Sequence, residues 1–144
     1  MILLNLKKIE LLKTFMIMKK IIYTKDAPAP IASYSQAVEQ NGMLFISGQV
    51  AINPAIGSVV SGGIAEQTTQ VMKNIQAIVT AAGYGNDLSK ILKCTIYLDD
   101  MSLYTDMNIV YGNCFPNDPP ARAAFAVKEL PLKVLVEIDA IAMK

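Results

Sequence analysis

The chain has 144 residues, with 13 basic and 12 acidic side chains, no histidine and two cysteines. The length suffices for one domain with a proper core, and an apolar share of 53% favours a subunit interface. From Ile21 onward there are 8 basic and 11 acidic residues, which argues against a large nucleic-acid surface. Without histidine, the commonest general base and metal ligand are both missing. Cys94 and Cys114 fit neither a metal site nor a disulfide framework, so reduced thiols are expected.

Residues 1–17 differ from the rest of the chain, because they mix Leu and Ile with Lys and contain neither Gly nor Pro. This pattern is compatible with a short amphipathic helix, but its lysines interrupt any signal-peptide core and no run approaches membrane-spanning length. We expect a dispensable extension, followed by one domain over residues 18–144. A helix that binds a membrane surface or a partner is the alternative.

The first half of the domain predicts strands. Residues 20–24 predict the first, and the proline-rich residues 26–33 predict an extended loop. Asn41-Gly42 separates two further strands, over 34–40 and 43–50, and is typical of a tight hairpin. On the second of these, regular alternation places one set of side chains on a common face: Met43, Phe45, Ser47 and Gln49.

Two small residues on that strand are candidates for a site. Gly48 lets another group approach the backbone closely. Ser47 has no histidine to activate it, so we expect a hydrogen-bonding serine rather than a nucleophile.

The middle of the chain predicts two helices and a strand. Residues 65–82 carry an apolar stripe and end at Gly83, a suitable C-terminal cap. Residues 91–98 predict a central strand. Asp99 or Asp100 then caps a second helix over residues 101–113. This helix carries Asn108, and its inward face is expected to hold Leu103, Met107, Val110 and Tyr111.

Arg122 is the only arginine in the chain and is surrounded by alanines and one phenylalanine. Lysine offers a point charge, whereas arginine grips a carboxylate or phosphate through two parallel hydrogen bonds. A cation among small apolar residues needs an anionic partner. Two interpretations are open, a buried structural salt bridge and an anion-binding arginine in a cleft.

The end of the chain predicts two strands, over 121–127 and 134–143, joined by a turn. If residues 130–133 form a four-residue loop, Arg122 pairs with Ile141. Arg122 and Glu137 then share a face, roughly 13 Å apart along the ladder, with room for a small acid. A slip of one residue would put them on opposite faces.

Five segments together carry a resemblance to a known family: APAPIASYSQAV, MLFISGQV, AIVTAAG, ARAAF and VEIDAIA. Over about residues 18–144 the chain resembles the Rid family, the reactive intermediate deaminases, also known as YjgF or as L-PSP endoribonucleases. The resemblance implies an α+β, chorismate-mutase-like fold, with a six-stranded mixed sheet and two helices on one face. It also implies a homotrimer whose clefts lie between subunits.

The resemblance assigns roles to single residues. Arg122 matches the arginine that holds the substrate carboxylate, and Glu137 matches the acid associated with the attacking water. Ala124 occupies a position where some members have cysteine, and Ala32-Ser33 replaces the Gly-Pro that often precedes the tyrosine. The remaining matches line the pocket or approach the ligand: Tyr34, Ser47, Gly48 and Asn108.

The implied activity is hydrolysis of 2-imino acids such as 2-iminobutanoate and 2-iminopropanoate to 2-keto acids and ammonia. An anion clamp, a carboxylate that deprotonates water and a dry pocket suffice for it, so no metal or cofactor is expected. We expect a cytoplasmic enzyme with a small 2-imino or 2-keto acid as its ligand and with neither nucleic acid nor membrane as partner. The alternatives are an endoribonuclease and a non-catalytic ligand-binding or chaperone-like trimer.

Overall fold

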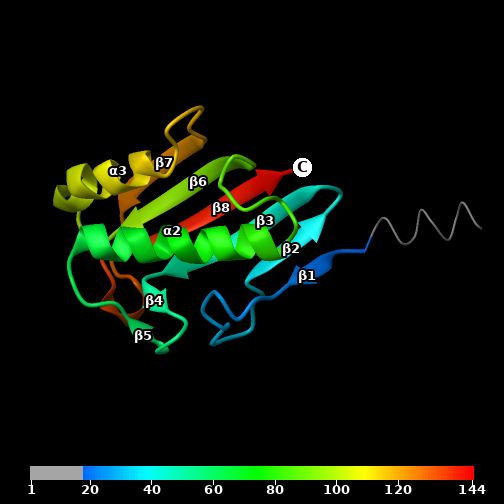
Figure 1. Ribbon diagram of the computed structural model, residues 1–144. Coiled ribbons are helices and arrows are strands. Elements are labelled where there is room, and N and C mark those ends of the chain that lie inside the picture. Colours follow the sequence, from blue (N-terminus) through cyan, green and yellow to red (C-terminus); the bar gives the residue numbers. More distant parts are fainter. Residues whose placement is uncertain (1–17) are drawn as a thin grey trace, which may run out of the picture.

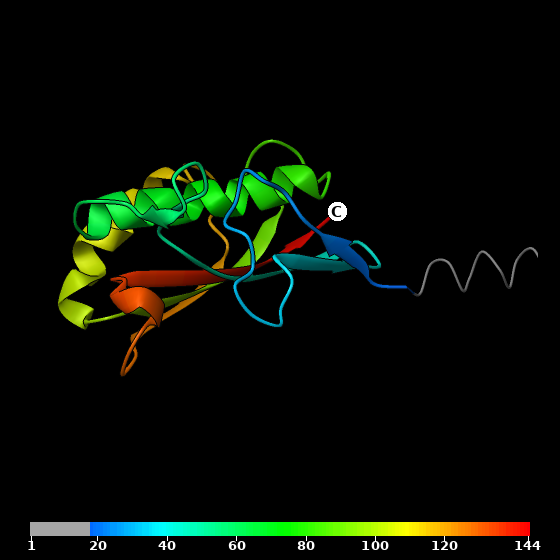
Figure 2. The same ribbon diagram turned by 90° about the horizontal axis from the view of Figure 1, so that it is seen from below.

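The computed structural model describes residues 18–144, and the expectations for residues 1–17 lie outside this part. Six strands form one sheet in the order β1-β2-β3-β8-β6-β7. Helices α2 (Ile64–Ala81) and α3 (Tyr104–Asn113) lie on one face of it (Figures 1 and 2), so the predicted α+β fold is confirmed. The strands are β1 Lys20–Ile22, β2 Ala37–Gln40, β3 Met43–Val50, β6 Ile91–Leu98, β7 Ala121–Ala126 and β8 Val136–Met143.

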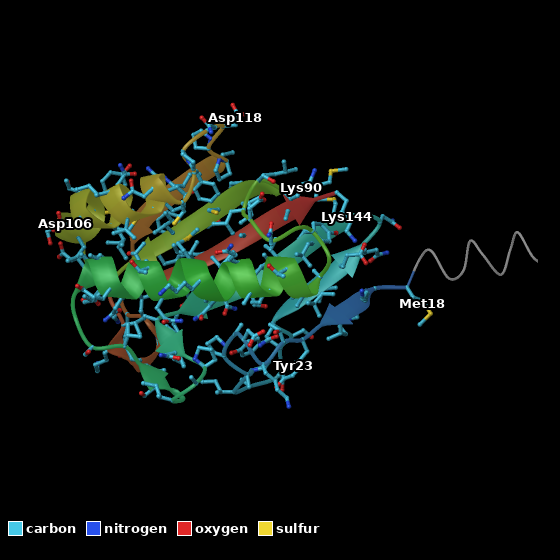
Figure 3. All side chains as sticks on the ribbon, in the orientation of Figure 1. Met18, Tyr23, Lys90, Asp106, Asp118 and Lys144 are labelled. Atoms are coloured by element: carbon cyan, nitrogen blue, oxygen red, sulfur yellow. The ribbon has the colours of Figure 1, made fainter. Side chains whose placement is uncertain are left out.

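Shorter elements complete the described chain. β4 (Ile52–Asn53) and β5 (Ser58–Val59) form a separate two-stranded ribbon, and the 3₁₀ turns are η1 (Met101–Leu103) and η2 (Pro131–Lys133). Figure 3 shows Asp106 on α3 and Asp118 in the loop that leads into β7.

The core lies between the helices and the sheet. On β8 the residues alternate, and Val136, Ile138, Ala140 and Ala142 are buried while the residues between them point to the opposite face. The apolar stripe of α2 covers these strands with four side chains that are fully buried: Val71, Ile75, Ile78 and Val79. The second face of the sheet carries no helix among the described residues.

The predicted turns and caps are confirmed where they depend on local chemistry. Asn41 and Gly42 both have positive φ, 54° and 80°, as a tight hairpin between β2 and β3 requires. Gly83 follows α2 with φ of 78°. Asp100 caps η1, where its Oδ1 accepts a hydrogen bond from the Ser102 amide at 2.7 Å, and α3 follows directly.

The predicted pairing of the last two strands is wrong. β7 pairs in parallel with β6, and β8 lies between β3 and β6, antiparallel to both. α3 is the crossover between β6 and β7, and such a crossover returns the chain parallel to the strand it left. β8 buries a full apolar face, so it gains more from a central position than the alanine-rich β7, which occupies the edge.

The predicted face of β3 is also wrong in part. The register between β3 and β8 shifts between Ile46 and Gln49, which marks a β-bulge at Ser47 and Gly48. Because a bulge inserts one residue, it reverses the alternation beyond it. Gln49 is therefore paired with Ile138 and is buried on the helix side, whereas Phe45 remains exposed on the open face.

Candidate active site

Arg122 extends from the edge strand β7 toward α3, where neutral groups hold it. Its Nη1 donates to Asn108 Oδ1 at 2.7 Å, and its Nη2 donates to the Tyr104 hydroxyl at 2.6 Å. Within residues 18–144 the one ion pair joins Lys133 to Glu129, so no carboxylate neutralises the guanidinium there. The interpretation as a structural salt bridge is therefore wrong for the described part of the chain. The arginine keeps its charge and has more N–H donors than these two bonds use.

Aromatic rings fix the position of the guanidinium. Its central carbon lies 4.9 Å from the centre of the Tyr111 ring and 5.5 Å from that of Tyr104. Both distances fall within the range of a cation–π contact. Tyr104, Asn108 and Tyr111 are spaced by four and three residues, so α3 presents them on one side.

A buried thiol lies on the same face of the sheet as Arg122. Cys94 is the parallel partner of Arg122 on β6 and is fully buried. Burial raises the pKa of the Cys94 thiol to about 11, so it is protonated and unreactive at neutral pH. Both cysteines are free, as predicted. Ala124, two residues after Arg122, also faces the helix side and packs against the core.

Glu137 points to the open face of the sheet, where it lies against the bulge in β3. A β-carbon added to Gly48 would collide with the Glu137 carboxylate, so the glycine lets this side chain keep its position and any larger residue would displace it. Burial, with a smaller contribution from the Asp139 charge, raises the pKa of the Glu137 carboxyl above its ordinary value. Asp139 itself accepts a hydrogen bond from the Tyr97 hydroxyl at 2.8 Å.

A loop with a polar anchor borders this carboxylate. Gln36 is buried, and its side chain bonds the backbone of Thr24, Ala27 and Pro28, which fixes the proline-rich segment. Ser47 Oγ donates to the Ser35 carbonyl at 2.7 Å and so secures the same loop beside the bulge. The loop and the open face enclose a concavity of about 740 Å³, which contains Tyr34, Ser47, Gly48 and Glu137.

The structure thus divides the expected site residues into two groups. Arg122, Asn108 and Ala124 form the edge group, on the helix side of β7. Tyr34, Ser47, Gly48 and Glu137 form the open-face group. Arg122 is paired with Cys94 and Glu137 with Tyr97, three residues further along β6, so the two side chains lie on opposite faces. The expectation that they share a face of one chain is wrong, because β7 and β8 are not neighbours.

Tyr104 and Tyr111 both contact Arg122. Neither is among the site residues that the sequence predicts. Tyr111 is expected from the sequence only as an inward-facing residue, and it is indeed buried. Their spacing from Asn108 is visible in the sequence, but it indicates a site only once Arg122 is known to lie against α3.

The described residues hold neither a cluster of metal ligands nor a membrane span. In residues 18–144 no three His, Cys, Asp or Glu side chains gather where they could hold a metal ion. No helix in this range is long and apolar enough to cross a bilayer.

The fold and the two groups define a protein with an unneutralised arginine at one sheet edge and a desolvated carboxylate on the open face. Residues 24–144 match the model of the family described as Endoribonuclease L-PSP. A RutC family protein of Pyrococcus horikoshii is 49% identical over 127 residues, which cover 88% of this chain and 99% of that protein. The chain therefore belongs to the Rid family, also called the RutC or L-PSP endoribonuclease family.

Two further relatives add detail. The 2-iminobutanoate/2-iminopropanoate deaminase of Mus musculus is 42% identical over 128 residues, which cover 89% of this chain and 93% of that protein. The crystal structure of YyfA from Yersinia pestis, a Rid family protein of unknown function, matches with a TM-score of 0.83 and 42% identity. That match covers 88% of this chain and all of the other.

Proposed function

We propose that this protein hydrolyses 2-imino acids to 2-keto acids and ammonia. The observation that carries the proposal is the Arg122 guanidinium, which neutral partners hold and no acidic side chain among residues 18–144 neutralises. A fixed, charged fork of this kind suits the carboxylate of a small acid. The 42% identity to the mouse deaminase supports the same substrate class.

Glu137 is the proposed general base. Burial raises its pKa above that of an ordinary glutamate, so its ionised form is a stronger base than an exposed carboxylate. The carboxylate takes a proton from water, and the water oxygen bonds to the imine carbon as the C=N π electrons move to nitrogen. The Glu137 carboxyl returns that proton to the nitrogen, which gives a carbinolamine with a hydroxyl and an amino group on one carbon. The hydroxyl proton then passes through the Glu137 carboxylate to the amino nitrogen. The C–N bond breaks, the C=O bond forms and ammonia leaves.

We further propose that each site is built by two copies of the chain. Arg122 and Glu137 lie on opposite faces of one sheet, so a ligand held by one cannot lie beside the other in the same chain. A neighbouring copy that covers the open face would bring its own Arg122 to the concavity. Large apolar side chains exposed on or beside that concavity support such an interface: Ile31, Tyr34, Phe45 and Leu132. A closed ring of three copies forms three equivalent sites of this kind.

We also place the protein in the cytoplasm. Cys94 and Cys114 remain free, and a reducing compartment keeps thiols in that state.

The proposal is tested by the loss of a 2-imino acid generated in a coupled assay, with wild type and Arg122→Lys compared on matched preparations. Lysine keeps the charge but loses the fork, so kcat/KM should fall by about one to two powers of ten while the melting temperature is retained. Equal rates for the two proteins would contradict the carboxylate clamp.

RNA cleavage measured on the same preparations tests the ribonuclease alternative, which predicts cleavage that weakens steeply with added salt. A trimer that binds 2-keto acids without hydrolysing the imine would be the non-catalytic alternative.

A further inference from the structure

The Tyr104 hydroxyl lies at the end of the Arg122 guanidinium, 2.6 Å from Nη2. A guanidinium has donors and no acceptor, so the phenol oxygen accepts this bond and the phenol hydrogen points elsewhere. Among residues 18–144 no other hydrogen bond engages this hydroxyl. Tyr104 therefore presents a donor beside the charged fork that nothing in the described chain uses.

Asn108 likewise accepts a hydrogen bond from the arginine and keeps its own donors free of it. Its Oδ1 accepts from Nη1 at 2.7 Å, so its amide nitrogen and both amide hydrogens are directed away from the guanidinium. The two groups that hold Arg122 are thus neutral acceptors toward the arginine and donors toward whatever lies beyond it. Because neither carries a negative charge, they fix the fork without weakening its attraction for an anion.

Building on the carboxylate site of the proposed function, we propose that Tyr104 contacts the substrate and donates its hydroxyl hydrogen to the carboxylate that Arg122 binds. An ionised carboxylate accepts about four hydrogen bonds, so a guanidinium does not saturate it. An O–H bond to a carboxylate is charge-assisted and shorter than a neutral one. The tyrosine ring and its hydroxyl then have separate tasks, since the ring contacts the cation and the hydroxyl contacts the anion.

Tyr104→Phe separates these tasks, because phenylalanine keeps the ring and loses the hydroxyl. The probe is 2-oxobutanoate, a 2-keto acid of the proposed product class, bound to the full-length protein and followed by NMR titration. We expect the dissociation constant to rise about tenfold, the effect of losing one charge-assisted bond, with the melting temperature unchanged.

Tyr84→Phe is the matched control. Tyr84 also has a cation over its ring, Lys144 Nζ at 4.5 Å, and its buried hydroxyl has no partner in the described chain. This residue lies away from Arg122, in the loop after α2, so its substitution should leave 2-oxobutanoate binding unchanged. An unchanged dissociation constant in Tyr104→Phe as well would overturn the proposal.

A second pair of variants distinguishes contact with the ligand from positioning of Arg122. In an Arg122→Ala background, a hydroxyl that only positions the arginine has nothing left to position, so Tyr104→Phe would have no further effect. A hydroxyl that donates to the carboxylate still loses a bond, and the dissociation constant should rise again by several-fold. An effect seen only when Arg122 is present would therefore reject the direct contact.

These measurements do not depend on turnover. If the wild type binds 2-oxobutanoate and responds to Tyr104→Phe but does not hydrolyse the imine, the proposed reaction fails and the inference about Tyr104 stands. If the wild type hydrolyses the imine but 2-oxobutanoate binds equally well to Tyr104→Phe, the inference about Tyr104 fails and the proposed reaction stands.

Discussion

Arg122 and Glu137 project from opposite faces of the same sheet, with β6 between the strands that carry them. Their Cα atoms are separated by two strand spacings across the sheet, roughly 10 Å, and by three residues along it, roughly another 10 Å. Neither side chain turns toward the other, because Arg122 is bound to α3 and Glu137 lies against Gly48. The proposed reaction uses both residues on one ligand, and this separation is why we propose a site completed by a second copy of the chain.

Mixing two inactive variants should restore activity. Arg122→Ala and Glu137→Gln each remove one group from every site of their own oligomer. When equal amounts are co-expressed, a site built by two chains obtains a wild-type Arg122 and a wild-type Glu137 in about a quarter of cases, so about a quarter of wild-type activity should return. The rate is measured on the purified mixture.

Two observations would contradict this prediction. A mixture no more active than the separate variants would place both groups in one chain or exclude one of them from the reaction. Light scattering provides the control, since the wild type and both variants should show about three times the chain mass, and a monomeric wild type would remove the shared site.

Gly48→Ala should impair both stability and activity, because the added β-carbon meets the Glu137 carboxylate. Forcing a methyl group into an occupied site costs about 1–3 kcal/mol, and here it also displaces the proposed base. Gly112→Ala is the matched control, since a β-carbon there meets nothing within 4 Å and alanine favours the helix by about 0.5–1 kcal/mol. Thermal melting and imine hydrolysis are measured on both; a Gly48→Ala protein with full activity would show that Glu137 need not keep its position.

Imine hydrolysis should decline on the acid side at a pH above the ordinary glutamate pKa of 4.5, because burial raises the pKa of Glu137 and only its ionised form accepts a proton. Glu137→Gln should lose at least two powers of ten in kcat/KM and with it this acid limb. An acid limb that persists unchanged in the residual activity of Glu137→Gln would assign it to another group.

The same shift in pKa has a consequence for stability. A carboxyl whose pKa is higher in the folded than in the unfolded state favours folding when protonated, and this contribution is lost as the pH rises through the folded-state pKa. At neutral pH, Glu137→Gln should therefore melt at a higher temperature than wild type, and the difference should shrink below the unfolded-state pKa. Thermal melting between pH 4 and pH 8, with ionic strength held constant, measures this difference.

A protein that begins at Met18 should match the full-length chain in turnover and melting temperature. Residues 1–17 lie outside the family match, which begins at residue 24, and differ in composition from the rest of the chain. Imine hydrolysis and thermal melting of both proteins provide the comparison. A large loss in either property would assign the segment a part in folding or in the site.

Most of the helices and strands could be predicted from the amino-acid sequence, because each depends on residues close together in the chain. The Asn41-Gly42 hairpin, the apolar stripe of α2 and the strand over Ile91–Leu98 all follow from local turn chemistry and periodicity. The motifs around Arg122 and Glu137 likewise suffice to indicate the family.

Which strands are neighbours, and what surrounds Arg122, depends instead on contacts between distant parts of the chain. The pairing of β7 with β6 results from the α3 crossover, and the central position of β8 results from burial across the whole sheet. The bulge at Ser47 and Gly48 lies where the Glu137 carboxylate occupies the space opposite it. These contacts join residues from 11 positions apart, as for Tyr111 and Arg122, to 100 positions apart, as for Met43 and Met143. Their energies depend on which surfaces meet, and periodicity along a single strand does not encode this.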